Sequence, residues 1–335
     1  MTRTPSAVDD WILDVSMKRV ILTEFDSANL AHVVAGAELE HQRLPGGGTK
    51  MELLHCTLPN SVINRGAYSP AVLVNGTFAS NTITIGMMLR QQTPTILNGS
   101  NVKMGTLQFY SENSEMCYRA WPNATWLAFV ISRERFLEFC LDRFDSVPSL
   151  PNTGIVTFEA NLEASGNELL HRLRDLDRSL PHFGALPNAA RLGKSVENDL
   201  LLRIGTAMSP KPPLQKVSEH HRLRLCREIL KETMEQIEED TDEMLDLQSM
   251  AKATRLSPRT LQRTFQAEYG LCPQEWLRVE RLNRVRKDLL KSRKGDSITR
   301  VATRWGFFHL SRFSQYYREL FGEKPSETVA RHVAA

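Results

Sequence analysis

The chain has 335 residues, of which 41% are hydrophobic and 24% charged, so it is long enough for two domains with separate cores. Its longest apolar runs, such as residues 124–131, fall well short of the roughly 20 residues that a membrane-spanning helix needs. The N-terminus carries Asp9 and Asp10 and no apolar stretch typical of a signal peptide. We therefore expect a cytoplasmic protein that does not enter a membrane.

Charge is unevenly distributed along the chain. The net charge is only +3, but residues 247–335 contain 18 lysines and arginines against 8 acidic residues, a net charge of +10. The remaining residues carry a net charge of −7. A basic C-terminal block on an acidic body is typical of a domain that binds phosphates, although a solvated basic face would give the same pattern.

The first part of the chain alternates between short strand patterns and turn residues. The expected strands are rich in β-branched, aromatic and other apolar residues, and they are 20–22, 51–58, 71–74, 82–88, 95–97, 106–110 and 125–131. Expected turns lie between them at 45–48, 59–60, 75–76, 98–100 and 122–123. This rhythm predicts an antiparallel barrel or sandwich.

Helical patterns follow the strands. Ser132 opens one helix, and residues 162–180 and 188–208 form two more, the last with Leu192, Val196, Leu200 and Ile204 at i+4 spacing. The proline-rich residues 209–217 then break the pattern and predict a linker. We expect a sensor domain at 1–208, whose last helices could pack on a second copy of the chain, and a second domain at 218–335 that begins with a helix at Ser218 and an acidic connection at 235–243.

The last ninety or so residues repeat at a spacing of 52. Leu261, Phe265, Gly270, Pro273 and Glu275 recur as Phe313, Tyr317, Gly322, Pro325 and Glu327. Each copy has the pattern of a helix-turn-helix unit, at about 247–270 and 297–322. Two such units in one chain can each place a helix in the major groove of the same DNA face.

In the first unit, Leu247, Met250 and Ala251 share one helical face, and Ser257 followed by Pro258 predicts the start of a new helix. Leu261, Phe265 and Tyr269 are expected to be buried, and Gly270 suits the helix end. The opposite face presents Arg259, Gln262, Arg263 and Gln266. Arginine can bind guanine and glutamine can bind adenine through two hydrogen bonds, so these residue types suit the reading of bases.

The second unit repeats the arrangement with one more residue in its turn. Asp296 or Ser297 caps a helix that buries Ile298, Val301, Ala302 and Trp305, and the next helix buries Phe313, Tyr317 and Leu320 or Phe321. Its outward face carries Ser311, Ser314, Gln315 and Arg318, flanked by His309 and Arg312. Between the units, residues 273–290 form one expected helix of about 27 Å, which suits reading helices held about one DNA turn apart.

Residues 247–325 resemble the DNA-binding domain of the AraC/XylS family of bacterial transcription regulators. The matching residues, in order, are Met250-Ala251, Ser257, Leu261-Gln262-Arg263-x-Phe265, Gly270-x-x-Pro273, Arg281-Leu282, Val301-Ala302, Trp305-Gly306-Phe307, Phe313, Tyr317 and Gly322-x-x-Pro325. The resemblance implies a seven-helix domain in which Arg259, Gln262 and Arg263 read one major groove and Ser311, Arg312, Ser314 and Gln315 the next. Trp276, Val285 and Thr328 depart from the family pattern, and Thr328 stands where an aromatic residue commonly closes the second unit.

The N-terminal strands resemble the cupin-like sensor half of the same regulators, so the fold class is α+β: a cupin-like barrel with following helices, then an all-α domain. His32, His41 and His55 form no His-x-His pair, so we expect no metal and no bound cofactor. A small organic effector inside the barrel is the preferred interpretation. Arg174 and Arg178 form a second candidate site, because arginine pairs bind phosphates and share the spacing of cyclic-dinucleotide receptors.

Gly46-Gly47-Gly48-Thr49-Lys50 differs from a phosphate-binding loop in its order and is expected to form a hairpin loop.

The sequence therefore predicts a DNA-binding transcription regulator, not an enzyme, that responds to a small molecule. The resemblance implies activation through RNA polymerase, and the helices before the linker make a homodimer the expected assembly. Two alternatives stay open: a cupin-type enzyme tethered to DNA, and an architectural DNA-binding protein without an effector.

Overall fold

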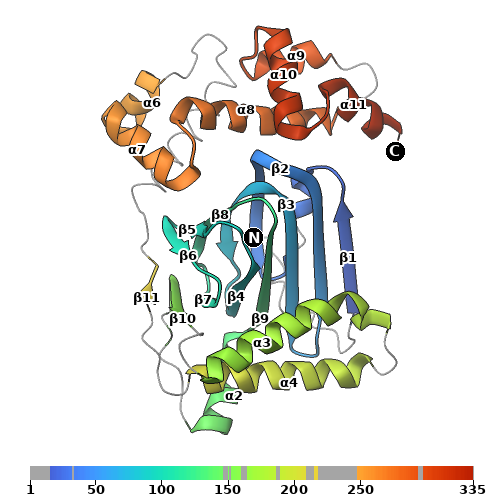
Figure 1. The fold of residues 1–335 in the computed structure, drawn as a ribbon, viewed down its shortest axis with the longest axis vertical. Helices are drawn as coiled ribbons and strands as arrows, with labels where there is room; N and C mark the ends of the chain where they lie inside the picture. Colours follow the sequence, from blue (N-terminus) through green and yellow to red (C-terminus); the bar gives the residue numbers. More distant parts are fainter. Residues whose placement is uncertain are drawn as a thin grey trace, which may run out of the picture.

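The computed structural model describes residues 16–31, 34–145, 150, 152–159, 164–185, 189–208, 215–217, 247–292 and 297–334. The helix expected from Ser218, the acidic connection at 235–243, most of the expected linker, His32 and Asp296 lie outside these residues. Within them, the chain forms an antiparallel sheet with helices at two sides, followed by an all-helical C-terminal region (Figure 1). The α+β class is therefore confirmed.

The described strands form one curled sheet of eleven strands in which every pair is antiparallel. They are β1 (Ser16–Leu22), β2 (Ala37–Thr57), β3 (Ser61–Phe78), β4 (Thr82–Arg90), β5 (Thr95–Leu97), β6 (Ser100–Val102), β7 (Thr106–Tyr110), β8 (Glu115–Ala120), β9 (Ala124–Ser132), β10 (Ile155–Glu159) and β11 (Gln215–Lys216). The short helix α1 (Ser27–Ala31) lies between β1 and β2. Because β11 pairs with β10, the end of the expected linker joins the sheet.

Two expected turns are strand interior instead. Residues 45–48 lie within β2, where the pairing with β3 shifts register on both sides of Gly47, so the glycines bend the strand and do not reverse it. Asn75 and Gly76 continue β3. A Cβ atom on Gly76 would lie 1.9 Å from the carbonyl oxygen of Glu38 on the neighbouring strand, so close strand approach explains this glycine. These glycines are therefore required by close packing within the sheet and do not form turns.

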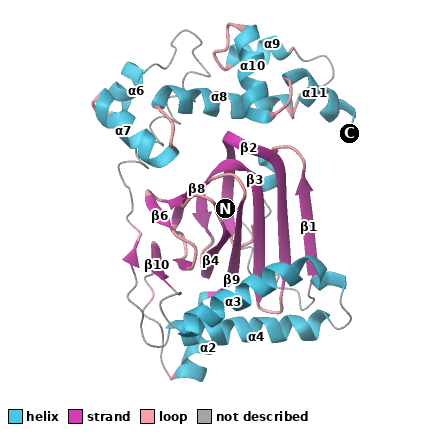
Figure 2. Cartoon of the chain, viewed as in Figure 1, coloured by secondary structure: helices cyan, strands magenta, loops and turns pink. Residues whose placement is uncertain are grey.

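Three helices cover one face of the sheet (Figure 2). They are α2 (Arg133–Phe144), α3 (Ala164–Ser179) and α4 (Ala189–Met208), and a 3-10 turn η2 (Leu180–Ala185) joins the last two. Ser132 caps α2 as expected, since its hydroxyl accepts from the Arg135 amide. On α4, Val196, Leu200 and Ile204 are buried, whereas Leu192 is 37% exposed. The buried face of α4 therefore includes three of the four expected residues and not Leu192.

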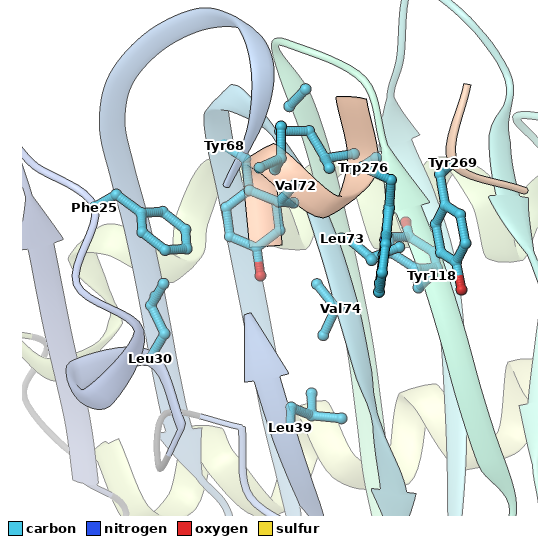
Figure 3. Packing of buried hydrophobic residues seen from close by; sticks show 14 of the residues in the cluster. Phe25, Leu30, Leu39, Tyr68, Val72, Leu73, Val74, Tyr118, Tyr269 and Trp276 are labelled. Atoms are coloured by element: carbon cyan, nitrogen blue, oxygen red, sulfur yellow. The ribbon is translucent and has the colours of Figure 1, made fainter. Parts of the chain in front are cut away.

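The C-terminal helices lie across one end of the sheet (Figure 1). They are α6 (Leu247–Thr254), α7 (Pro258–Tyr269), α8 (Pro273–Leu289), α9 (Ile298–Arg304), α10 (Leu310–Phe321) and α11 (Pro325–Ala334). Their buried side chains join those of the neighbouring sheet end in one continuous core, in which Trp276 and Tyr269 lie near Leu73 and Tyr118 (Figure 3). None of the described helices is long and apolar enough to cross a membrane.

Glu197 ties α4 to the turn between β2 and β3. The buried carboxylate accepts hydrogen bonds from the Asn60 amide at 2.9 Å, the Asn60 side chain at 3.0 Å and the Ser61 hydroxyl at 2.6 Å. Replacing Glu197 with Ala leaves these donors without their partner, so we expect the free energy of unfolding to fall by about 2–3 kcal/mol in urea denaturation. The control is Glu168→Ala on α3, whose exposed side chain should change stability by less than about 0.5 kcal/mol.

Candidate nucleic-acid interface

The first helix-turn-helix unit consists of α6 and α7. Ser257 begins α7, because its hydroxyl accepts from the Thr260 amide, and Pro258 occupies the first turn. Arg255 takes a left-handed backbone conformation (φ 53°) in the turn, so the reversal occurs without a glycine. Behind α7, the rings of Phe265 and Trp276 pack edge to face with centroids 5.2 Å apart.

The second unit, α9 and α10, repeats this backbone closely up to the turn. The Leu256 amide donates to the Ala251 carbonyl at 3.1 Å, and the Phe307 amide donates to Ala302 at 2.9 Å. The residues equivalent to Arg255 and Leu256 are thus Gly306 and Phe307, at a spacing of 51. One additional residue follows, Phe308, which is 57% exposed and restores the spacing of 52 in α10. This confirms the expectation of one more residue in the second turn.

Both second helices end in the same way, with a glycine in the left-handed region. Gly270 closes α7 with φ 65° and Gly322 closes α10 with φ 77°, and each amide donates to a carbonyl four residues earlier. Pro273 and Pro325 then begin α8 and α11. Two copies of one local fold therefore stand at the two ends of α8.

All eight residues expected to read bases are exposed on α7 and α10. They are Arg259, Gln262, Arg263 and Gln266 on the first helix, and Ser311, Arg312, Ser314 and Gln315 on the second. Arg259, Arg263 and Arg312 form no ion pair with any described residue, and Gln315 donates to Glu319 at 2.9 Å. Each helix thus presents one buried face and one polar face, and the two polar faces carry hydrogen-bonding groups suited to DNA.

Helix α8 is the spacer between the units. Its 17 residues give a length of about 25 Å. At its far end, Trp305 donates to Asp288 at 2.8 Å and the Arg284 guanidinium lies 5.2 Å from the centre of the Trp305 ring. These contacts fix the second unit to α8, whereas Phe265, Tyr269 and Trp276 fix the first.

A buried arginine on α8 connects the helical region to the sheet. Arg286 is 3% exposed, donates to the Phe25 carbonyl at 2.5 Å and pairs with Glu323 at 2.5 Å. Its guanidinium also lies 3.7 Å from Glu24. Glu24 and Glu323 both pair with Arg331 of α11. One charge cluster therefore contains groups from the start of the chain and from its last helix.

Strand β2 supplies a second connection. The buried Arg43 donates from its Nε to the carbonyl of Leu320, near the end of α10. Its backbone exchanges two hydrogen bonds of 3.0 Å with the side-chain amide of Asn283 on α8. Burial and the neighbouring charge of Arg286 lower the pKa of Arg43 to about 10, so the side chain stays charged at neutral pH.

The glycines that end α7 and α10 also face the sheet. A Cβ atom on Gly270 would lie 2.6 Å from the Arg119 guanidinium, and one on Gly322 would lie 3.4 Å from Thr49. Burial lowers the pKa of Arg119, and the buried carboxylate of Glu268 on α7 opposes that shift. The C-terminal ends of α7 and α10 therefore lie against the end of the sheet.

Inside the curled sheet lies a small cavity of about 60 Å³. Its walls are mostly apolar and aromatic, and the described residues that line it are Val34, Leu39, Tyr68, Val74, Phe78, Thr84, Gly86, Met87, Gln108, Tyr110, Met116, Tyr118, Trp126, Leu127 and Ala128. His41 lies behind Tyr68, with its Nε2 3.1 Å from the tyrosine hydroxyl. This is the barrel interior in which the sequence analysis placed an effector.

The other candidate effector residues are elsewhere. Arg174 and Arg178 are exposed on α3, on the helix layer and not in the cavity, and Arg178 pairs with Asp175 at 3.2 Å. Asp177 pairs instead with Arg65 on β3 at 2.6 Å. Among the described residues, no three metal-binding side chains gather in one place.

Sequence reasoning missed the residues that join the two regions. Arg43, Asn283 and Arg286 carry no motif, although Arg43 follows Leu39 and His41 at alternate positions, which places the three on one side of a strand. The atypical Thr328 is also explained. It is 1% exposed, and it bonds Tyr317 at 2.9 Å and Glu323 at 2.7 Å, so a hydroxyl closes the second unit where an aromatic ring was expected.

Replacing Arg286 with Met should lower the free energy of unfolding by about 3–5 kcal/mol, because it leaves the buried Glu323 without its main partner. Urea denaturation followed by tryptophan fluorescence measures the loss. Arg304→Met is the matched control, since that side chain is 55% exposed and 3.8 Å from Asp288, and it should change stability by less than about 1 kcal/mol. Equal effects of the two substitutions would contradict the assigned role of Arg286.

Stability should also depend on pH through His41. Burial lowers the pKa of His41 to about 4, against 6.5 for an exposed histidine. The neutral ring therefore stabilises the fold fully above pH 6.5, and this contribution is lost as the pH falls towards 4. We expect His41→Gln to be less stable than the wild type at pH 7, with a difference that shrinks by pH 4.5 in urea denaturation. A difference independent of pH would rule this out.

Known proteins resemble the C-terminal region most clearly. A helix-turn-helix domain family model matches residues 250–331. The XylDLEGF operon transcriptional activator 2 of Pseudomonas putida is 38% identical over 97 residues, which are 29% of this chain and 62% of that protein. The probable thc operon regulatory protein of Rhodococcus erythropolis is 34% identical over 102 residues, 30% of this chain and 31% of that protein. The chain thus matches less than two thirds of the length of either relative.

A solved transcriptional regulator with an AraC-type DNA-binding domain, from Chromobacterium violaceum, is 31% identical. That match covers 32% of this chain and 93% of the solved chain, with a TM-score of 0.27. The named relatives are regulators, and none of these matches indicates a catalytic family. The matched helix-turn-helix region and the sequence identities confirm that the C-terminal region resembles the DNA-binding domain of the AraC/XylS family of transcription regulators.

Proposed function

We propose that this chain is a sequence-specific DNA-binding regulator that reads two successive major grooves. The observation that carries the proposal is the pair of reading helices, α7 and α10, which stand at the two ends of one spacer helix and expose polar faces of the residue types that bind bases. Arg259, Gln262, Arg263 and Gln266 would contact the first groove. Ser311, Arg312, Ser314 and Gln315 would contact the second.

The region before residue 209 would act as the sensor, with residues 209–217 as the linker and 218–335 as the DNA-binding domain. A small effector in the cavity would change the position or freedom of α7 and α10. The contacts of Arg43 and Arg286 connect the sheet directly to the helices, so a change in the sheet would reach them. Activation of transcription through contacts with RNA polymerase is the expected outcome, since the Pseudomonas putida relative is named a transcriptional activator. The protein would work in the cytoplasm, where it meets bacterial DNA.

The proposal has two further parts. A homodimer through α4 is favoured by Leu192 and Leu202, which are each 37% exposed on that helix. An anionic effector such as a cyclic dinucleotide at Arg174 and Arg178 stays a prediction. Both arginines are exposed to solvent, and Arg178 forms an ion pair with Asp175 that such an effector would have to replace.

The proposed groove reading is tested on Arg263. Arg263→Ala should weaken binding to the specific operator by about 1–3 kcal/mol and weaken binding to random DNA much less, because a base contact is lost and non-specific phosphate contacts remain. Fluorescence anisotropy at fixed salt measures both affinities. The control is Arg135→Ala on α2, an exposed arginine outside the C-terminal region, which should leave both affinities unchanged.

Footprinting tests the two-groove arrangement directly. Full-length protein should protect two segments about one helical turn, roughly 34 Å, apart on one face of the duplex. Protection of a single groove would refute reading by both helices. An equal loss on specific and random DNA for Arg263→Ala would refute only the assignment of that residue as a base reader.

A further inference from the structure

We propose that the cavity inside the sheet binds an uncharged, largely apolar molecule that carries a single hydroxyl or carbonyl group. The inference rests on the proposed regulatory function and names the class of effector that this particular cavity fits. Three properties of the cavity wall support this ligand class: an apolar lining, no charged side chain among the described lining residues, and a buried polar side chain without a hydrogen-bond partner.

The wall is built for an apolar ring or chain. Phe78 and Tyr110 lie with ring centroids 4.4 Å apart, and Tyr68 and Trp126 with centroids 6.1 Å apart, and all four line the cavity. Val34, Leu39, Val74 and Met116 add further apolar groups to the lining. Aromatic faces and aliphatic groups of this kind attract apolar ligands and offer little to a sugar-like molecule with many hydroxyl groups.

The described lining contains no lysine, arginine, histidine, aspartate or glutamate. Behind the wall, His41 is buried and bonded to the Tyr68 hydroxyl, and burial lowers its pKa to about 4. A carboxylate or ammonium in this cavity would leave water without an opposite charge to meet it. The cavity therefore selects against ions of either sign.

The cavity wall contains a buried polar group that lacks a hydrogen-bond partner within the described chain. The Thr84 hydroxyl is 1% exposed and, among the described residues, forms no hydrogen bond. By contrast, Thr82, two residues earlier on β4, donates to the Ala79 carbonyl at 3.0 Å. Buried hydroxyls are nearly always bonded, so an unbonded one in a cavity wall points to a partner that the chain does not supply. A ligand hydroxyl or carbonyl would supply it.

The size of the cavity adds a condition. At about 60 Å³ it is less than half of a roughly 150 Å³ apolar cavity that accepts benzene, so a ring-sized ligand must displace side chains. Met116 lines the wall and is unbranched and flexible, which suits such movement. At Gly86 the backbone lies close to the Tyr110 ring, since a Cβ atom there would lie 3.0 Å from it. Binding should thus move the Met116 side chain before the backbone.

Three probes of similar shape separate charge from polarity: benzyl alcohol, ethylbenzene and benzoate. Isothermal titration of the full-length protein at neutral pH should detect binding of the two neutral probes, with benzyl alcohol threefold to tenfold tighter than ethylbenzene because it satisfies Thr84. Benzoate should bind at least tenfold more weakly than benzyl alcohol. Benzoate binding as tightly as benzyl alcohol, or no binding of either neutral probe, would overturn the inference.

Variants locate the binding. Ala128→Leu fills the cavity and should weaken both neutral probes by at least tenfold. Thr84→Val should remove the advantage of benzyl alcohol over ethylbenzene, whereas Thr82→Val, outside the lining, should preserve it. Circular dichroism confirms that each variant is folded. Unchanged affinities in the folded Ala128→Leu protein would place the probes elsewhere and refute the assignment.

Affinity for operator DNA without any probe separates this inference from the proposed function. Specific DNA binding together with failure of the probe results would refute the effector class and leave the regulator intact. Loss of specific DNA binding in the wild-type protein would refute the regulator, whatever the probes do.

Discussion

A buried charge cluster determines how the two halves of this protein meet. Arg286 is almost completely enclosed, and an enclosed guanidinium is tolerated only with opposite charges and hydrogen-bond acceptors around it. Those partners come from both halves: the Phe25 carbonyl from the segment before β2, and Glu323 from the loop after α10. Separation of the halves would leave Arg286 without the Phe25 carbonyl, so the cluster holds α8 against the end of the sheet.

The arrangement of the reading helices follows from this contact. The ends of α7 and α10 that carry Gly270 and Gly322 lie against Arg119 and Thr49 of the sheet, while their polar faces stay exposed. The sheet thus supports the helices from behind, at the residues where each helix stops. Both helices end at a glycine in the left-handed region, and a helix that begins with proline follows each of them. The two units therefore end with the same local structure.

The helical region could be predicted almost completely because its signals are local. Ser257, Pro258 and Gly270 set the ends of α7 through capping, which depends only on neighbouring residues. The sheet was harder, since Gly47 and Gly76 are dictated by the approach of another strand and were expected to form turns. The contacts of Arg43 and Asn283 join residues 240 apart, and no local pattern encodes such a pairing. The eight base-reading residues stay predictions that rest on their exposure and chemistry.

The course of β2 has a mechanical consequence. Leu39, His41 and Arg43 alternate along one side of its regular part, before the glycine bend, so they form a row from the hollow of the sheet to the spacer helix. A ligand that moves Leu39, or moves Tyr68 of β3 and with it His41, would act on the strand whose Arg43 bonds Asn283 and Leu320, so binding in the cavity would also change how α8 and α10 contact the sheet.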